Sequence, residues 1–434
     1  MSAYPAGEAA SRLLLRRELI PWTLLGLALG LVEGATAAVL IKSRFGGESA
    51  TWSVNLAVAM VSGAPALSNV VSFIWANIAH GRPRVQMIVA MQMLFAIVVG
   101  VVGLAPQASR GLALTVVSIL VARMVWAGLL TIRTTVWIAN YPRQVLAQST
   151  GRIVVVSSLS VASMAAITAW TLDHGAIDPR WLYGGAALSG LLGAWLYRTT
   201  RVRREFKLLD AETSAATRSG AFSLRMVLEI LRGDRDFGRY MFWMGLYGGG
   251  NLMLVSQLVV VLSDHLQVEP SRQIMMLAVV PLLMLPACTP FWARLFDGQH
   301  VVAYRARQAW ALVFAGVVLV AAAFARSEPL LWGGALLLGF ANAGAHLGWN
   351  LGHNDFATPG RAQHYMGVHV TLTGVRGMLA PPLGMLLYQW LEARAPGAGR
   401  WALILPLALL AGGASGFNAM HREHQRRANQ AGDG

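Results

Sequence analysis

The sequence predicts an all-α integral membrane protein whose twelve transmembrane helices form two pseudo-symmetric six-helix bundles. Of the 434 residues, 56% are hydrophobic and 13% are charged, and the mean hydropathy is +0.52. A water-soluble protein of this length could not bury so much apolar surface. A single polar stretch, residues 198–236, separates two apolar halves. The predicted domains are a tail (1–18), a bundle (19–197), a linker (198–236), a bundle (237–420) and a tail (421–434).

Each half contains six apolar segments, and each segment is long enough to cross a bilayer as a helix, which takes roughly 20 residues. The predicted spans are 19–41, 54–77, 85–104, 111–138, 153–172, 181–197, 237–262, 273–295, 308–324, 330–351, 365–391 and 401–420. Within the linker, apolar residues recur at near-helical spacing over 222–231. We expect a short helix on the membrane surface there.

The distribution of basic residues predicts the orientation of these spans. Arg and Lys concentrate in the two tails, the linker and the loops on the same side, including 294–307, and such residues mark the cytosolic side. We therefore expect a multi-pass protein of a bacterial inner membrane with both termini in the cytosol. The loops on the other side are short, so no soluble catalytic domain fits anywhere in the chain.

The two halves repeat a short pattern at the end of their second helix. Residues 75–81 read WANIAHG and residues 292–298 read WARLFDG, and Pro142 and Pro359 follow at matching places. With the basic linker, this duplication resembles the major facilitator superfamily. The resemblance implies that residues 76–84, including Arg82, and Asp297 form the family's cytosolic gate motif, with Arg84 at a basic position. His80 stands where that motif has aspartate, so charge pairing there would depend on pH.

The resemblance further implies a secondary transporter that works by alternating access around a central site, and not an enzyme. The sequence contains no GxxxxGK[ST] phosphate loop, which excludes ATP-driven transport by this chain alone. We expect no cofactor. The expected partners are a small-molecule solute, the lipid bilayer and, for a coupled carrier, protons; we expect no nucleic acid, and a monomer.

Ionisable residues within the predicted spans are candidates for the site, because they are costly in a bilayer. Glu33 lies in the first span, and Asn251 lies near the corresponding place in the seventh. Glu33 fits a proton carrier, and it equally fits a structural ion pair with an arginine.

The fourth predicted span places two guanidiniums and two indoles along one helical stripe, whose members recur at spacings of three and four: Arg123, Trp126, Leu130, Arg133 and Trp137. A guanidinium suits a carboxylate, phosphate or sulfonate, and an indole suits a ring. The alternative for Arg133 is a side chain that reaches the cytosolic interface.

Spans ten and eleven add polar residues that share helical faces. His369, Thr373 and Arg376 lie four and three residues apart, and His346 and Asn350 lie four apart. We expect Arg376 to face the central cavity. The histidines lack the paired ligands typical of a metal site, so we expect no metal there.

The excess of arginine over acid within the spans favours an anionic or zwitterionic organic solute. Glu33 would couple its transport to protons, whereas exchange of two anions needs no such group. Two alternatives remain: a proton-coupled efflux carrier for cationic or amphiphilic compounds, and a receptor or accessory protein that binds without transport.

Overall fold

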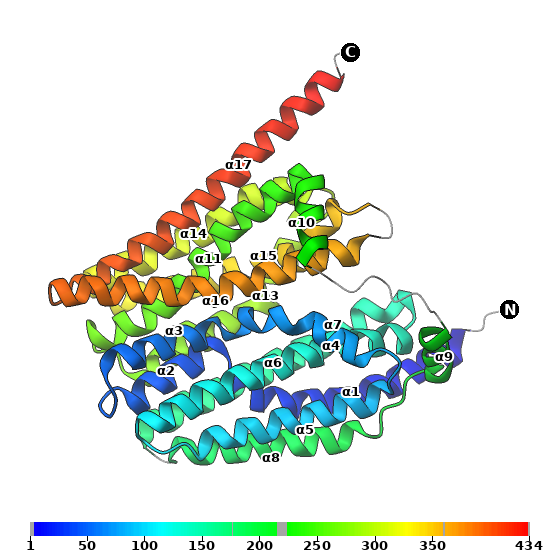
Figure 1. Ribbon diagram of the computed structural model, residues 1–434, viewed down its shortest axis with the longest axis horizontal. Helices are drawn as coiled ribbons and strands as arrows, with labels where there is room; N and C mark the ends of the chain where they lie inside the picture. The colour runs from blue at the N-terminus through cyan, green and yellow to red at the C-terminus, as the bar shows by residue number, and fades with distance from the viewer. Residues whose placement is uncertain (1–3, 176, 215–223, 359–360, 433–434) are drawn as a thin grey trace.

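The computed structural model describes residues 4–175, 177–214, 224–358 and 361–432, and this part of the chain is helical without a strand. Figure 1 shows two helical bundles, one above the other. The first half comprises α1 (Tyr4–Leu31), α2 (Gly34–Phe45), α3 (Thr51–Leu67), α4 (Ser72–Ala79), α5 (Arg84–Gly103), α6 (Ser109–Asn140), α7 (Arg143–His174) and α8 (Pro179–Tyr197). The linker contains α9 (Glu205–Ser214) and α10 (Leu224–Gly233).

The second half comprises α11 (Arg235–Asp264), α12 (Pro270–Ile274), α13 (Val280–Phe296), α14 (Val301–Ala325), α15 (Glu328–Leu351), α16 (Ala362–Arg394) and α17 (Ile404–Gly432). A π-helical turn, Met275–Val279, joins α12 to α13. We call the end of the bundle with α9, α10 and the starts of α5, α11 and α16 the linker face. The end with the loops 46–50, 104–108, 265–269 and 395–399 is the opposite face (Figure 1).

In the described residues, ten helices are long and apolar enough to cross a membrane, and the bent pair α1 and α2 makes an eleventh span. The helix predicted as the sixth span, α8, falls outside that set, yet it packs along α1 and α5 within the first bundle. The chain is therefore a multi-pass membrane protein.

The first predicted span is wrong as a continuous helix, because the chain bends by 42° between α1 and α2. Glu33 adopts an extended backbone at the break, with φ −85° and ψ 126°. The break interrupts the α-helical hydrogen bonds in mid-membrane, so that the Glu33 side chain leaves the helix at a point where α6 can meet it.

The ninth predicted span begins too late, because α14 starts at Val301 and not at Gln308. The His300 side chain accepts a hydrogen bond from the Val302 amide at 3.2 Å, and Asp355 accepts one from the Val301 amide at 2.6 Å. These two caps extend the helix by two turns. As a result Arg305, which the sequence places in a loop, lies inside the second bundle and is 1% exposed.

The repeated pattern has the same construction in both halves. Trp75 donates its indole N–H to the carbonyl of Met124 at 2.9 Å, and Trp292 donates to the carbonyl of Phe340 at 2.8 Å. The glycines that end the two copies, residues 81 and 298, have φ of 68° and 77°, a conformation that favours glycine. Pro359, the later partner in this pattern, lies outside the described residues.

Helix α10 buries its apolar side against protein. Val227 and Ile230 are 3% and 5% exposed, and the helix packs against α11 and α16. The sequence instead suggests an apolar face turned toward lipid; Phe222, at the start of that stretch, lies outside the described residues.

The halves meet most closely along α3 and α16. A Cβ atom at Gly63 would lie 2.5 Å from the carbonyl oxygen of Gly377, and one at Gly377 would lie 2.5 Å from the amide nitrogen of Leu67. Glycine at both positions permits this backbone contact between the halves.

Candidate functional site

Glu33 and Arg123 form an ion pair inside the first bundle. The Arg123 Nη1 atom lies 2.6 Å from Oε2 of Glu33, and the two side chains are 7% and 27% exposed. The pair joins the break between α1 and α2 to the middle of α6. The charge of Glu33 is therefore compensated within the protein, as one of the two sequence interpretations anticipates.

Arg133, further along α6, has a different environment. Its guanidinium carbon lies 4.3 Å from the ring centre of Trp137 and 4.8 Å from that of Trp22 in α1. Trp126 also packs edge-on against Trp22, at 6.1 Å between ring centres. The aromatic stripe of α6 thus forms a cation–π site together with α1.

A buried carboxyl, which the sequence analysis did not select, completes this cluster. Glu18 in α1 is 0% exposed and accepts hydrogen bonds from Trp137 Nε1 at 2.7 Å and from the Tyr141 hydroxyl at 3.1 Å. The first predicted span begins at residue 19, so Glu18 falls in the predicted tail. The apolar residues that share its helical face are the sequence signal that could have identified Glu18 as buried.

In the second bundle, Arg376 binds across from α16 to α11. Its Nη1 donates to the carbonyl of Met244 at 2.8 Å, and its Nη2 donates to Thr373 Oγ1 at 3.0 Å. The Thr373 hydroxyl oxygen also accepts from Trp349 Nε1 at 3.2 Å, and the Trp349 ring packs on His369 at 5.2 Å. The structure thus brings the predicted α16 residues together as one polar cluster.

Arg305, which the sequence analysis missed, lies behind this cluster. Its Nη1 donates to Gln308 Oε1 at 2.6 Å, its Nη2 donates to the carbonyl of Ala345 at 3.1 Å, and its guanidinium lies 5.8 Å from the ring of Tyr247. Within the described residues, neither Arg305 nor Arg376 has an ion-pair partner. The interior of the second bundle is consequently positive.

His346 faces the first bundle from α15. Its side chain is exposed, and it lies close enough to Glu33 and Arg305 to interact with both charges. The Asn350 side chain donates to the backbone carbonyl of His346 at 2.8 Å. Asn251 keeps a buried Oδ1 atom without a hydrogen-bond partner. His346 is thus acted on by a charge of each half.

The predicted gate motif contacts the linker. The buried Arg84 donates its backbone N–H to Glu205 of α9 at 2.9 Å and its Nη1 to the carbonyl of Arg82 at 3.0 Å. His80 ends α4, and Asp297 ends α13 with an exposed side chain.

An ion pair joins the two halves at the opposite face. Lys42 of α2, 8% exposed, lies 2.8 Å from Oδ1 of Asp264 in α11 and donates to Asn55 Oδ1 at 2.7 Å. The Tyr388 hydroxyl lies 3.3 Å from Asp264 and 2.9 Å from His265 Nε2. Gln389 adds a bond between the halves by donating to the carbonyl of Trp52 at 2.8 Å. Polar contacts therefore close the opposite face.

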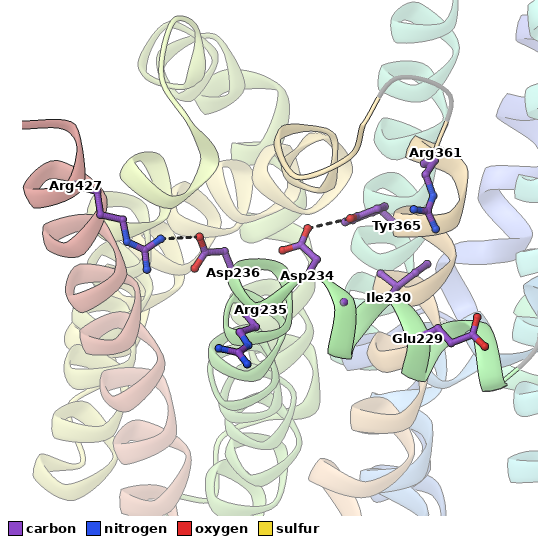
Figure 2. Close-up of a pocket in the computed structure, with 9 residues that line it drawn as sticks. Glu229, Ile230, Asp234, Arg235, Asp236, Arg361, Tyr365 and Arg427 are labelled. Atoms are coloured by element: carbon purple, nitrogen blue, oxygen red, sulfur yellow. Dashed lines mark hydrogen bonds and ion pairs between the residues drawn. The ribbon is translucent and has the colours of Figure 1, made fainter. Parts of the chain in front are cut away.

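A cavity of about 670 Å³ lies on the linker face, between α10 and the ends of α11, α16 and α17. Figure 2 shows the residues that line it. Its carboxylates are bound locally, since Asp236 pairs with Arg427 at 3.0 Å and Asp234 accepts from the Tyr365 hydroxyl at 2.9 Å. The arginines of the bundle interior do not line it. This cavity is therefore separate from the interior cluster.

The described residues contain no group of three or more His, Cys, Asp or Glu side chains that could hold a metal ion.

Comparison with solved structures identifies the architecture. The nucleoside transporter NupG matches with a TM-score of 0.70 at 11% identity, over 94% of this chain and 99% of that one. A D-xylose–proton symporter gives 0.69 at 10% identity, over 93% and 96%. The chain has the major facilitator fold. A bacterial homologue of the human lysosomal transporter Spinster, in an inward-facing and unoccupied conformation, gives 0.65 at 13% identity, over 97% and 98%.

At the level of sequence, no family model and no curated protein matches the chain. The major facilitator fold nevertheless explains the duplicated tryptophan and glycine geometry and the approach of α3 to α16. These matches are to transporters, and they extend over nearly the whole length of both chains.

Proposed function

We propose that this protein is a secondary transporter of a small organic anion or zwitterion with an apolar or ring part. One observation carries the proposal: Arg133 and Arg376 lie in the bundle interior without an ion-pair partner in the described chain, whereas Glu33 is paired with Arg123 and Glu18 is hydrogen-bonded by neutral donors. Both guanidiniums are partly buried, and a partly buried cation without an ion-pair partner attracts an anionic ligand.

The aromatic neighbours of these arginines support a solute with a ring. Trp22 and Trp137 flank Arg133. Trp349 and Arg376 both donate a hydrogen bond to Thr373 Oγ1, so they lie close together. Trp22 and Trp137 are buried and Trp349 is partly exposed, so a planar ring can stack on Trp349 while its acidic group meets the Arg376 guanidinium.

The contacts between the halves support alternating access. The Lys42–Asp264 pair and the α3–α16 contact hold the opposite face closed. We assign the linker face to the cytosol of a bacterial inner membrane, on the distribution of basic residues. The structure then corresponds to an inward-facing state, and transport requires the Lys42–Asp264 pair to break.

The ion pair of Glu33 argues against the cationic alternative. A carrier for cationic amphiphiles needs an interior carboxylate free to meet its substrate, and Arg123 lies 2.6 Å from the Glu33 carboxylate. Neutral or protonated amphiphiles would have no matching charge at Arg133 or Arg376.

A thermal-shift screen of the detergent-purified protein tests the proposal. Benzoate, phenylphosphate and benzenesulfonate should raise the melting temperature of the wild type by mass action, and tetraphenylphosphonium should not. Arg376→Ala should abolish the shift, whereas Arg326→Ala, an exposed residue at the opposite face, should retain it. Stabilisation by the cation alone, unchanged in Arg376→Ala, would contradict the anion assignment.

A further inference from the structure

Glu18 is a buried carboxyl group without a cationic partner at ion-pair distance among the described residues. Both of its hydrogen bonds come from neutral donors, Trp137 Nε1 at 2.7 Å and the Tyr141 hydroxyl at 3.1 Å. A carboxyl that is 0% exposed and bound only by neutral groups can exist in either protonation state at a modest difference in free energy. Glu18 therefore has the environment of a group that gains and loses a proton.

Arg133 is the cation whose charge acts on this carboxyl, and its side chain is only partly buried. Its Nε atom is buried without a partner, and its two terminal nitrogens make no hydrogen bond in the described chain. The terminal nitrogens are absent from the buried atoms that lack a partner, so solvent or a solute can reach them. The open end of this guanidinium is free to bind an anion.

Trp137 connects the two groups physically. Its indole N–H donates to Glu18, and the face of its ring lies 4.3 Å from the Arg133 guanidinium carbon. Trp22 packs against both Arg133 and Trp137, with 6.5 Å between the two indole centres. The carboxyl and the guanidinium thus share one aromatic wall in a water-poor environment, where charges interact strongly.

We propose that Glu18 takes up the proton that accompanies binding of an organic anion at Arg133. This inference rests on the proposed function. In the empty site, burial disfavours the Glu18 carboxylate, whereas its hydrogen-bond donors and the positive charge of Arg133 favour it. A bound anion neutralises Arg133 and adds negative charge beside Glu18, so the carboxylate accepts one proton from water. By linkage, protonation of Glu18 must strengthen anion binding by the same factor.

Among the groups of this cluster, Glu18 is the one that we expect to gain or lose a proton near physiological pH. Besides Arg133 and Trp137 of α6, it faces Trp22 on its own helix, Tyr141 after α6 and Tyr197 at the end of α8. The two tyrosines are buried and remain neutral at physiological pH.

Glu33, the carboxyl that the sequence favours for coupling, is less suited to this role. Its carboxylate is paired with Arg123, which lies in a different turn of α6 from Arg133, so Glu33 does not belong to the Arg133 cluster.

Proton uptake on benzoate binding tests the inference directly. Detergent-purified protein in weakly buffered solution is mixed with benzoate, and the pH change is followed together with binding. We expect the wild type to take up close to one proton per benzoate at the optimal pH, and its affinity to fall with rising pH by up to tenfold per unit. Glu18→Gln, which mimics the neutral carboxyl, should bind benzoate without proton uptake and with a pH-independent affinity.

Two further variants separate coupling from structure. Glu48→Gln, at an exposed acid in the loop 46–50, should take up protons like the wild type. Tyr141→Phe removes a donor to the carboxylate, so it should move the pH midpoint of benzoate affinity upward; a purely structural role would lower stability and leave that midpoint unchanged.

In proteoliposomes, Glu18→Gln should keep exchange of labelled for unlabelled benzoate and lose accumulation driven by a pH gradient. Benzoate binding without proton uptake in the wild type, or undiminished uptake in a folded Glu18→Gln protein, would overturn the role of Glu18 and leave the anion carrier intact. Failure of the wild type to bind any anion of the screen would overturn the proposed function and this inference with it.

Discussion

Replacing Lys42 with methionine should shift the conformational equilibrium of the protein. Lys42 is 8% exposed and Asp264 is 29% exposed, and their atoms lie 2.8 Å apart. Loss of one partner costs about 3–5 kcal/mol for a fully buried pair and about 0.2–1 kcal/mol for an exposed pair. Because Asp264 stays partly solvated and keeps its contact with Tyr388, we expect about 1–2 kcal/mol, which corresponds to a change of roughly 5- to 30-fold in population.

This cost should apply only to the state in which the halves meet at the opposite face, so the other state should gain population. Spin labels at Glu48→Cys and Arg326→Cys, in exposed loops of the two halves, report the separation there by pulsed electron resonance, with Cys288 replaced by serine. Lys42→Met should increase the long-distance population. Arg272→Gln breaks an exposed ion pair within the second half and should leave the distances unchanged. An unchanged distribution in Lys42→Met would refute the assignment of the pair as the contact that closes this face.

Three further substitutions test other parts of the structure. Arg305→Met should lower stability by about 1–3 kcal/mol in a thermal melt, because Gln308 Oε1 and the Ala345 carbonyl each lose a hydrogen bond from a charged donor; no loss would show that Arg305 does not hold the second bundle together. Gly63→Val should push α3 away from Gly377 and increase the same long-distance population; an unchanged population would contradict the close contact. Burial lowers the pKa of His300 below its ordinary value, so stability should be lost as the pH falls below about 6.5, where the protonated ring can no longer accept from the Val302 amide. Asparagine can accept from the Val302 amide both above and below pH 6.5. His300→Asn should therefore reduce the change in melting temperature between pH 7.5 and 5.5; an unchanged slope would place the titration at another group.

The sequence sufficed for the parts of the fold that depend on local patterns. Apolar length and loop charge predict the spans, and the tryptophan and glycine copies around residues 75 and 292 predict the duplicated halves, which have the same hydrogen bond in the structure. Each of these signals lies within one short segment, so it requires no knowledge of tertiary contacts.

The candidate site was predictable only in part, because its chemistry depends on which side chains meet. The sequence admits an arginine partner for Glu33 but cannot choose Arg123, and it cannot pair Lys42 with Asp264 across the two halves. In the sequence, Arg305 resembles an ordinary basic residue of a loop. It belongs to α14 because the start of that helix is capped, in part by Asp355, which is distant in the sequence. Tertiary contacts, and not local propensity, decide these positions.

Flux of a labelled anion into sealed proteoliposomes tests the central claim most directly. The anion that best stabilises the purified protein is loaded inside the vesicles, and entry of the labelled form from outside is followed. Our account predicts counterflow with the wild type and its loss in Arg376→Ala, which removes the cation held between α16 and α11. Binding of the anion without any movement into wild-type vesicles would contradict transport and favour a receptor that uses the same fold.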